Sequence, residues 1–313
     1  MRVVVTGAGG FIGWHTVDAL LGRGDTVQAW SHVSPAADWG PAVESVKVDM
    51  TDGQVIDRQL KQFMPDVVVH LAALSLPQRS WRDPASTYQV NVIGSIHLLE
   101  AVRQLTPMPR LLLVGSSAEY AEPDDGRLIA EDAPTQPNSP YASSKLAVDQ
   151  LALLFVRRYR MDIVRFRPFS FVGPRKTGDV CSDFARRLVA IERGARPVMR
   201  VGSLDVVRDL IDVRDGVNGI LHLMDKGQSG EMYNVCGGNS VSIGDILDGY
   251  RRLSTLPFEV KQDTNLIRAL EQKVKIGNPG KLCALGWKLE HDLADTLDAI
   301  LNYWRQKPNA SLV

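Results

Sequence analysis

The sequence lacks an excess of charge of either sign. Lysine and arginine together number 36, and aspartate and glutamate together also number 36, among 313 residues. Long-range attraction to a polyanion needs an uncompensated positive field. We therefore expect no nucleic acid and no anionic membrane surface as a partner.

Cysteine is scarce, and its spacing suggests no pairing. Cys181, Cys236 and Cys283 form no CxxC motif, and no histidine stands near them at metal-ligand spacing. A chain of this length can build an ordinary core without disulfides or a metal, and neither is expected here. We expect all three thiols to be reduced core residues of a cytoplasmic protein.

Long apolar runs are missing as well. The stretch MRVVVTGAGG begins directly on a strand-like run, without the charged and long apolar segments of a secretion signal. No apolar run reaches the roughly 20 residues that a membrane-spanning helix requires. Secretion and membrane insertion are not expected.

The first half of the chain alternates short apolar runs with helical patterns. The runs read RVVVTG, TVQAWS, VESVKVD, DVVVHLAA, RLLLVGSS and MDIVRFRP. Short runs of Val, Ile and Leu are typical of parallel sheets that helices cover on both faces. The pattern predicts a doubly wound α/β fold, with helices after the first run and near 53–63, 84–105 and 141–158.

The alternation fades after about residue 170, where segments punctuated by glycine and proline take over. We expect residues 1–170 to form a large α/β domain and residues 171–313 to form mainly a smaller lobe. Some segments within about 205–240, including EMYNVCGG, are expected to return to the first domain.

Three glycines follow the first predicted strand at the opening of a helix. Gly7, Gly10 and Gly13 in VVVTGAGGFIG have the spacing GxxGxxG, with Phe11 and Ile12 between the last two. Such glycines let the backbone turn sharply, approach a pyrophosphate and direct helix N–H groups at it. Taken alone, the triplet fits a tight strand-to-helix turn equally well.

Residues at two further strand ends support a dinucleotide site. Asp49, followed by Met50, ends the third predicted strand, where a carboxylate can accept a hydrogen bond from an adenine amino group. The segment HLAA ends the fourth, and it places Leu71, Ala72 and Ala73 beside the expected cofactor path. Asp49 alone would more often be a helix cap. Together with the glycines, cofactor binding is the better interpretation.

The end of the second predicted strand bears on the choice between NAD and NADP. An acidic residue there would bond the ribose 2′-hydroxyl and repel a 2′-phosphate. The strand ends QAWSHVS, with Ser31 and His32 and no carboxylate. NADP is therefore favoured over NAD, although the arginine that usually meets the phosphate is missing too.

Tyr141 and Lys145 stand at i and i+4 in SPYASSK, one above the other on a helix face. We expect the lysine ammonium, with the positive charge of an oxidised cofactor, to lower the pKa of the phenol. The phenol would then be a proton donor or acceptor near neutral pH. Without further context, an exposed tyrosine beside a solvated lysine is the simpler interpretation.

An ordered set of motifs supplies that context: GxxGxxG, HLAA, Asn91 in NVIGS, GSSAEY, YxxxK and RPFSFVGP. By these motifs the chain resembles the extended short-chain dehydrogenase/reductases that act on nucleotide sugars, over essentially its whole length. The resemblance implies a Rossmann domain at 1–170 that binds NADP and a nucleotide-sugar lobe at 171–313. It also adds Asn91 and Arg167 to the cofactor-binding residues.

In that family, a serine or threonine four residues before the tyrosine of the strand-five motif joins the YxxxK pair. Counting back from Tyr120 gives Ser116, so the resemblance implies a catalytic triad of Ser116, Tyr141 and Lys145. Ser116 would hydrogen-bond the sugar carbonyl oxygen, and Tyr141 would pass it a proton. Lys145 would tune Tyr141 and hold the nicotinamide ribose while hydride moves between the ring and the sugar carbon.

Family members differ two residues before that same tyrosine. The 4,6-dehydratases carry Glu there, and the GDP-fucose synthases carry a Cys paired with a distant His. Here the residue is Ala118, which cannot exchange protons. Glu119 is adjacent, but on an extended segment it would point to the opposite face. Cys181 and Ser182, where the histidine would be sought, are poor acids. The site is thus equipped for one hydride and one proton.

The second half carries VGSLDVVRDLIDVRD and LIRALEQKVKIGNPGKLCALGW. In order and spacing these resemble the GDP-sugar branch: the GDP-mannose 4,6-dehydratases and, more closely, the GDP-4-keto-6-deoxymannose reductases. The resemblance implies that Arg208 and Arg268 clamp the diphosphate with their planar forks and that Glu271 faces the ribose or base. It completes the substrate-binding set with the following residues: Ser117, Ala118, Glu119, Ser170, Arg175 and Val201.

Two motifs depart from that branch. The family's RPFN is RPFS here, so that Ser170 replaces an amide with a shorter hydroxyl, and RPxE has become RALE at 268–271. These changes leave the sugar open between a hexose and a heptose. Surface salt bridges, of Arg208 with Asp209 or of Arg268 with Glu271, are the alternative for either arginine taken singly.

The expected activity is NADPH-dependent reduction of the C4 ketone of a GDP-4-keto-6-deoxy sugar, for the synthesis of surface-polysaccharide precursors. One alternative is a nucleotide-sugar 4-epimerase with tightly held NAD, for which the triad alone suffices. Another, of a different class, is a non-catalytic dinucleotide sensor or scaffold that kept the fold.

The resemblance also implies a homodimer, formed through the helices near 84–105 and 141–158. The apolar stripes of these helices are equally consistent with packing against the core of the same chain. They comprise Leu98, Leu99, Val102, Leu105, Leu151, Leu154 and Phe155.

Overall fold

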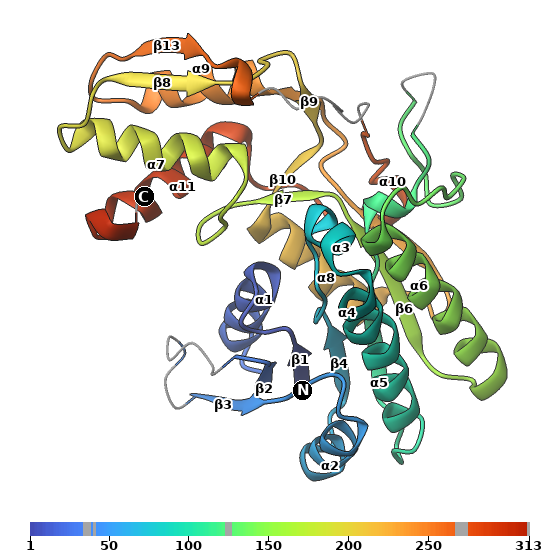
Figure 1. Ribbon diagram of the computed structural model, residues 1–313. Helices are drawn as coiled ribbons and strands as arrows, with labels where there is room; N and C mark the ends of the chain where they lie inside the picture. The colour runs from blue at the N-terminus through green and yellow to red at the C-terminus, as the bar shows by residue number, and fades with distance from the viewer. Residues whose placement is uncertain (34–38, 40–41, 123–126, 267–274, 312–313) are drawn as a thin grey trace.

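The computed structural model spans residues 1–313 and describes the chain except for residues 34–38, 40–41, 123–126, 267–274 and 312–313. Within the described chain, a seven-stranded parallel sheet runs in the order β11-β6-β5-β4-β1-β2-β3 (Figure 1). Its strands are β1 (Arg2–Thr6), β2 (Thr26–Ser31), β3 (Val43–Lys47), β4 (Val67–His70), β5 (Arg110–Val114), β6 (Ile163–Pro168) and β11 (Met232–Val235). The strand order reverses direction at β1, which confirms the predicted doubly wound α/β class.

Helices cover both faces of this sheet (Figure 1). Val3 and Val5 of β1 pack into one buried cluster with α1 and α8, whereas Val4 packs into another with α2, α5 and α6. Alternate residues of one strand thus serve two cores, which is why the predicted strands are apolar throughout. These helices are α1 (Phe11–Gly22), α2 (Gly53–Phe63), α5 (Gly94–Val102), α6 (Pro140–Tyr159) and α8 (Val213–Lys226).

Local sequence sets the ends of the helices that matter for the site. The carboxylate of Asp52 accepts hydrogen bonds from two N–H groups of α2, which makes it the cap of that helix. The hydroxyl of Ser139 caps α6, and Pro140 occupies the first helical position, where a missing N–H costs nothing. Arg160, with a φ of 58°, ends α6 in the left-handed region.

The helix predicted near 84–105 is built in three pieces. A π-helical turn, η2 (Gln89–Ile93), joins α4 (Pro84–Tyr88) to α5, and the short helix α3 (Pro77–Arg82) precedes them. On α5 and just after it, Leu98, Leu99, Val102 and Leu105 are buried in the core beneath the sheet. Of the two interpretations of this stripe, packing against the same chain is therefore the one observed.

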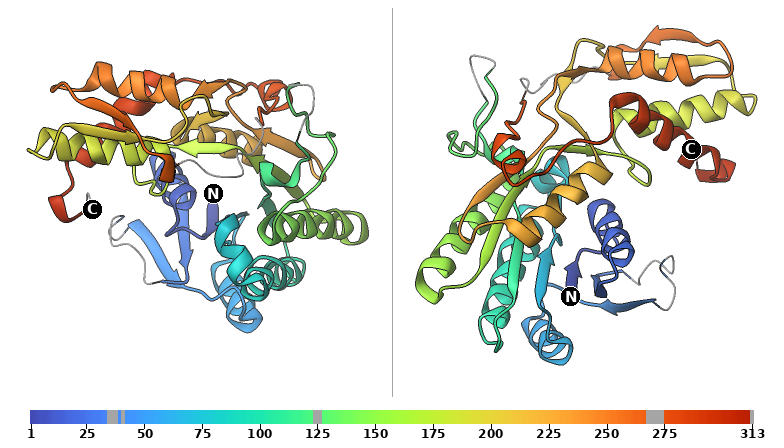
Figure 2. Two further views of the ribbon diagram at one scale, coloured as in Figure 1. Left: turned by 45° about the horizontal axis from the view of Figure 1, so that its top comes forward. Right: turned by 180° about the vertical axis from the view of Figure 1, so that it is seen from behind.

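A second lobe lies beside the first and has its own core (Figures 1 and 2). It consists of α7 (Val180–Glu192), α9 (Ile243–Leu253) and α11 (Leu293–Arg305), with the parallel pair β8 (Val198–Val201) and β13 (Glu259–Gln262). Two short strand pairs lead into it: β7 (Ser170–Val172) with β10 (Leu210–Asp212), and β9 (Val207–Arg208) with β12 (Val241–Ser242). The remaining short elements are η3 (Ser117–Glu119), η4 (Thr264–Leu266), α10 (Gly280–Cys283) and η5 (Asn309–Ser311).

The chain passes between the two lobes more than once. After α7 and β8 in the second lobe, the chain returns to the first. There α8 packs beside α1, and β11 pairs with β6 at the edge of the main sheet. The buried Asp209 helps to fix this crossing, because its carboxylate accepts hydrogen bonds from the N–H groups of Gly237, Gly238 and Gly277. The segment EMYNVCGG thus contributes a strand to the first sheet.

The cysteines depart in one respect from expectation. Cys181 and Cys236 are buried, but Cys283 is exposed at the end of α10. The prediction of three core thiols is therefore wrong for Cys283, because α10 buries the neighbouring Leu282 in the core and leaves Cys283 exposed. Among the described helices, none is both long and apolar enough to cross a bilayer.

Candidate functional site

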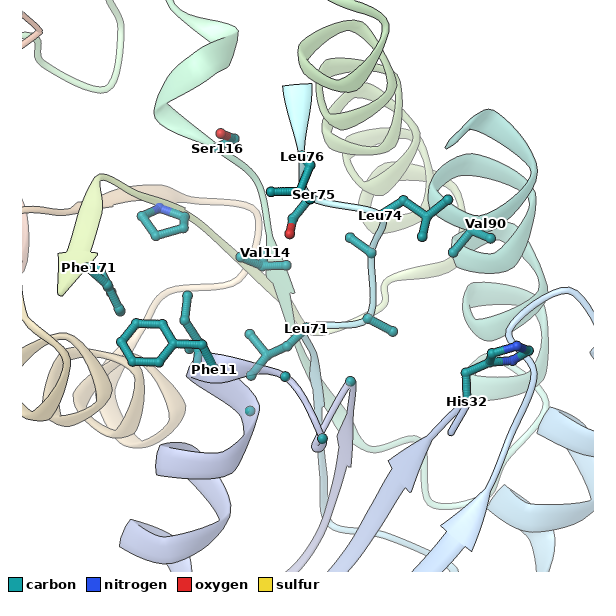
Figure 3. A pocket seen from close by; sticks show the side chains of 18 of the residues that line it. Phe11, His32, Leu71, Leu74, Ser75, Leu76, Val90, Val114, Ser116 and Phe171 are labelled. Atoms are coloured by element: carbon teal, nitrogen blue, oxygen red, sulfur yellow. The ribbon is translucent and has the colours of Figure 1, made fainter. Parts of the chain in front are cut away.

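A cavity of about 970 Å³ opens along the carboxyl ends of the main strands. In Figure 3, His32 lies at one end of it and Ser116 and Phe171 lie toward the other, with Leu71 and Val114 between them. The cavity therefore spans the region where strand order reverses, which is where parallel α/β sheets bind ligands. The loop of residues 175–179, which leads into the second lobe, closes one side.

The glycine loop forms the floor of this cavity, and at Gly7 and Gly13 only glycine fits the backbone. Gly7 has a φ of 68°, and a Cβ there would lie 2.8 Å from the backbone of Ala72. A Cβ on Gly13 would lie 2.2 Å from the carbonyl oxygen of Gly7. Since Gly10, at the N-cap of α1, has no side chain to accept a hydrogen bond, the first N–H groups of the helix are left to meet a ligand.

The predicted adenosine end carries His32 and Asp49. The Nδ1 atom of His32 lies 3.8 Å from an oxygen of Asp49. The other oxygen of Asp49 accepts hydrogen bonds from the N–H and hydroxyl of Thr51, which lower the pKa of that carboxyl. Asp52, not Asp49, caps α2, so the helix-cap alternative for Asp49 fails.

Ser116, Tyr141 and Lys145 meet at the cavity wall. Ser116 follows β5, while Tyr141 and Lys145 stand one turn apart on α6, and all three line the cavity although each is largely buried. The side chains of Ser116 and Tyr141 are hydrogen-bonded to each other. The N–H of Tyr141 donates to the hydroxyl of Ser80 on α3, which fixes the start of α6. The three residues that the sequence singled out are therefore assembled in space.

The protonation of this group differs from the expectation. Burial raises the pKa of Tyr141, and the hydrogen bond with Ser116 offsets this only in part. Burial lowers the pKa of Lys145 to about 8. The predicted lowering of the phenol's pKa by Lys145 is thus wrong in direction here, because desolvation disfavours both charged forms. At neutral pH, Tyr141 keeps its proton, and Lys145 is mostly charged.

Glu119 and Arg167 lie behind the cavity wall rather than in it. After Ser116 the chain turns into the one-turn helix η3, so the alternation of an extended strand does not apply. Glu119 is fully buried and accepts hydrogen bonds from Ser116 N–H, at 2.7 Å, and from Arg167, at 2.8 Å. The assignments of Glu119 to substrate and of Arg167 to cofactor are corrected accordingly: the two form a buried ion pair.

Asn91 is also removed from the cofactor contacts. Its amide side chain accepts a hydrogen bond from Leu74 N–H at 2.8 Å and donates to the Leu74 carbonyl and to the Ser144 hydroxyl. The segment that it anchors, Leu74–Leu76, does line the cavity. Asn91 therefore shapes the site from behind.

The predicted substrate residues are spread over both lobes. Ser117 and Arg175 line the cavity, while Ala118 is half-buried on η3 next to it. Ser170 on β7 and Arg208 on β9 lie outside its lining, and Val201 is a core residue of the second lobe, which corrects its assignment to substrate. Arg268 and Glu271 lie outside the described residues.

Sequence reasoning missed the loop that closes the cavity. Lys176, Thr177, Gly178 and Asp179 follow Arg175 there and line the cavity. The signal was available, since two adjacent cations bracketed by Gly-Pro and Gly-Asp follow a strand in GPRKTGD. Phe169 and Phe171 of the preceding strand region, and Leu74–Leu76 after β4, were missed as well.

This loop is tied to the first turn of α1. The imidazole of His15 is hydrogen-bonded to the Pro174 carbonyl at 2.9 Å, and the Lys176 ammonium lies 5.4 Å from the centroid of the Phe11 ring. Arg175 has a φ of 75° and stacks over Trp14. The loop thereby brings two cations next to the glycine turn.

Comparison with known proteins gives consistent results. Residues 3–236 match the NAD dependent epimerase/dehydratase family. The chain is similar to the GDP-6-deoxy-D-mannose reductase of Pseudomonas aeruginosa, with 30% identity over 310 residues that cover 98% of each chain.

Two solved structures extend the comparison. The structure of RMD from Pseudomonas aeruginosa complexed with NADPH has a TM-score of 0.83 and 30% identity, covering 97% of this chain and 98% of that one. The Thermus thermophilus UDP-glucose 4-epimerase in complex with NAD has a TM-score of 0.86 and 27% identity, covering 98% and 99%. From the glycine turn, the assembled triad and these matches, we conclude that the chain is an oxidoreductase-type enzyme belonging to the NAD dependent epimerase/dehydratase family.

Proposed function

We propose that this enzyme reduces the C4 ketone of a GDP-linked 4-keto-6-deoxy sugar to an alcohol, with NADPH as cofactor. One observation carries the proposal. Ser116, Tyr141 and Lys145 are assembled at the cavity wall, while neighbouring Ala118 has no ionisable group. Ketone reduction needs one hydride and one proton, and it needs no acid or base acting on a neighbouring carbon.

The cavity residues fit a dinucleotide. Because Gly7 and Gly13 carry no Cβ, the loop packs tightly against the Ala72 backbone and the Gly7 carbonyl oxygen. This tight turn leaves the first N–H groups of α1 uncapped, and a pyrophosphate can approach them closely. The Asp49 carboxylate accepts a hydrogen bond from the adenine amino group. When bound, NADPH supplies the hydride that reaches the sugar carbon.

The triad handles the proton. Ser116 hydrogen-bonds the ketone oxygen, and Tyr141 donates its hydroxyl proton to that oxygen as the carbon–oxygen double bond is reduced. Burial keeps the phenol protonated until that moment. Lys145, mostly charged at neutral pH, holds the ribose hydroxyls next to Tyr141.

The nucleotide sugar is proposed to lie between the two lobes. Ser117 and Ser170 contact the sugar, and Arg208 and Arg268 hold the diphosphate, with Glu271 toward the ribose or base. The similarity to a GDP-6-deoxy-D-mannose reductase over nearly the whole chain supports GDP over other nucleotides. A hexose and a heptose both remain within the proposal. The product would serve as a precursor of a surface polysaccharide.

The choice of NADPH rests on the end of β2. Ser31 and His32 line the cavity there and bring no carboxylate that would repel a 2′-phosphate. The likeness to a structure that holds NADPH supports this, although another similar structure holds NAD. Binding of NADPH and NADH measured side by side by calorimetry should show tighter binding of NADPH.

The direct test of the activity is consumption of NADPH. The purified enzyme is mixed with NADPH and the product that a GDP-mannose 4,6-dehydratase makes, and the absorbance of NADPH is followed. We expect it to fall in proportion to the keto sugar added. If NADPH persists with GDP-, UDP- and dTDP-linked keto sugars alike, the proposal is wrong.

A 4-epimerase is the second candidate, favoured by the likeness to the Thermus thermophilus enzyme. Such an enzyme would be purified with dinucleotide bound, and it would interconvert two sugars without net consumption of cofactor. Mass spectrometry of the denatured protein distinguishes the two activities, since a reductase releases its cofactor at each turnover.

A non-catalytic sensor would keep the cavity without needing the phenol. Tyr141→Phe removes one oxygen atom from the cavity wall. A reductase should lose most of its turnover but still bind NADPH, whereas the readout of a sensor should not change.

We propose further that the enzyme is a cytoplasmic homodimer, paired through α4, η2 and α6. Exposed apolar side chains on all three elements support this face: Tyr88 on α4, Ile93 on η2 and Leu154, which is 57% exposed, on α6. Light scattering should give a molecular mass twice that of the chain. In the Leu154→Glu variant, the measured mass should fall to that of a single chain.

A further inference from the structure

Four buried charges lie beneath the triad in one connected network. Glu119 Oε2 accepts a hydrogen bond from Arg167 Nε at 2.8 Å, and Arg167 Nη2 donates to Asp149 Oδ2 at 3.2 Å. The other oxygen of Asp149 accepts from Arg165 Nη1 at 2.5 Å. Two carboxylates and two guanidinium groups balance each other formally. Such a network is costly to bury unless its members are all paired.

One end of this network touches the triad directly. Glu119 Oε1 accepts a hydrogen bond from the N–H of Ser116, and the Ser116 hydroxyl accepts one from Ala118 N–H. This is a capping box closed on a single turn, so the side chain of Glu119 fixes the backbone from which the Ser116 hydroxyl projects. Both oxygens of Glu119 act as acceptors, which favours the ionised carboxylate even though burial raises its pKa.

The charged and titratable groups around Glu119 come from three elements. Lys145 and Asp149 face it from α6, together with the phenol of Tyr141, and Arg167 faces it from β6. His70 of β4 is also buried, and the charge of Lys145 contributes to the lowering of its pKa. Tyr120 lies under the Arg167 guanidinium, 4.4 Å from its carbon to the ring centroid. The negative charge of Glu119 acts to raise the pKa of both Tyr141 and Lys145.

We propose that Glu119 is a positioning residue of the reaction: from inside the protein, its carboxylate fixes the backbone of Ser116 and places a buried negative charge near Tyr141 and Lys145. This inference rests on the proposed role of the triad. It gives a function to the acid next to Ala118 that is different from contact with the sugar. Glu119 touches neither substrate nor cofactor, and it acts through Ser116 and through its charge.

The chemical consequence follows from the sign of that charge. A buried carboxylate favours the protonated forms of its neighbours, so the charge of Glu119 acts to raise the pKa of Tyr141 and opposes the lowering of the Lys145 pKa by burial. A proton donor must still hold its proton when the ketone arrives, and Lys145 must still be charged. Glu119 thus prepares the site for reduction and not for oxidation of an alcohol.

The test is Glu119→Gln, which keeps an oxygen for Ser116 N–H but removes the charge. The protonation of Tyr141 is followed by NMR of protein labelled at the tyrosine ring carbon that bears oxygen, with Tyr141→Phe used to assign the signal. We expect the Tyr141 titration to move to lower pH. The alkaline fall in kcat/KM should move to lower pH as well.

Asp149→Asn is the matched control. It removes one buried carboxylate from the same network, but Asp149 does not touch Ser116, and its charge is not among those that act on Tyr141. The Tyr141 titration should therefore stay where it is in the wild type. If both variants shift it equally, or if neither does, Glu119 has only a structural role and the proposal is overturned.

A second variant guards against loss of folding. Glu119→Gln removes one of the two carboxylates that pair with the buried Arg167 guanidinium, which destabilises the fold. Combining Glu119→Gln with Arg167→Gln removes both members of the ion pair, which costs less stability. The same shift of the Tyr141 titration is expected in the double variant, and its absence would overturn the proposal. Because the NMR titration needs no turnover, a failed reductase assay and a failed role of Glu119 are told apart.

Discussion

The guanidinium carbon of Arg175 lies 4.2 Å from the centroid of the Trp14 ring on the first turn of α1. This places Arg175 beside the helix turn that follows the glycine loop, whereas Ser170 and Arg208, with which the sequence had grouped it, lie outside the cavity lining. The positive φ of Arg175 adds a second constraint, since the left-handed region favours glycine. We infer that its charge serves the cofactor phosphates.

Arg175→Gly separates this role from stability. Glycine relieves the left-handed backbone while the contact with Trp14 is lost, so the free energy of unfolding should stay within about 1 kcal/mol of the wild type. The dissociation constant for NADPH should rise roughly tenfold, as expected for loss of a charge-assisted hydrogen bond. Calorimetry with NADPH and, separately, with GDP decides the matter: weakened GDP binding with NADPH unaffected would return Arg175 to the substrate.

Lys145 predicts the alkaline limit of activity. Its pKa is lowered to about 8 by burial, and its charged form is the one that holds the ribose. Activity should therefore be full below this value and fall roughly tenfold per pH unit above it. Lys145→Arg keeps a positive charge at all accessible pH values, so the fall in kcat/KM should move to higher pH. An unchanged limb would mean that another group titrates there.

His70 predicts a loss of stability in mild acid. Thr6 donates to its Nδ1 and its Nε2 donates to Ser95, whose own hydroxyl donates to the Asn91 carbonyl, so the neutral ring satisfies every partner. Burial lowers the pKa of His70 from 6.5 to about 3. Between these two pH values, His70 is protonated in the unfolded chain but stays neutral in the folded one. Stability is therefore full above about pH 6.5 and is lost as the pH falls toward 3.

The size of this effect is measurable by urea unfolding at pH 7 and pH 5. His70 should cost about 2 kcal/mol between these values. His70→Gln keeps a donor and an acceptor but does not titrate, so its free energy of unfolding should fall by about 2 kcal/mol less than that of the wild type. Equal losses in the two proteins would show that carboxylates alone cause the acid sensitivity.

Two glycines on the same helix give a paired prediction for the cofactor turn. In Gly13→Ala, the new Cβ meets the Gly7 carbonyl oxygen, so we expect a loss of about 1–3 kcal/mol in unfolding free energy and loss of NADPH binding. Among the described residues, no atom outside the adjacent helix backbone lies within 4 Å of where a Cβ on Gly22, at the other end of α1, would stand. Gly22→Ala should bind NADPH normally and gain up to about 1 kcal/mol. Matching defects in both variants would refute the steric argument.

Much of the fold could be predicted because the main sheet is made of contiguous apolar runs. Each run of the first half became a strand, and Gly7, Asp49 and Ser116 came to line one cavity because parallel strands end at a common edge. The loop Arg175–Asp179 could not be placed in this way. Its position depends on contacts with Trp14 and His15, far away in sequence, and no local pattern encodes them.

Glu119 and Arg167 show a different limit. The sequence places both residues near a strand end. Their amino-acid types there are equally compatible with an exposed ligand contact and with a buried ion pair. The outcome was decided by one turn of helix at Ser117–Glu119, which rotated the acid inward. A pattern of alternation is informative only as long as the backbone stays extended.

The π-helical turn at Gln89–Ile93 makes the length of this segment part of the site. A π turn takes one residue more per hydrogen-bonded ring than an α turn, so removing one residue here would let α4 continue into α5 as a regular helix with both in nearly their present places. The bulge that carries Asn91 would then be lost, and its amide would no longer meet the backbone of Leu74. Among relatives, a single-residue gap at this point should therefore accompany a differently shaped cavity beside Leu74–Leu76, even where every named residue is retained.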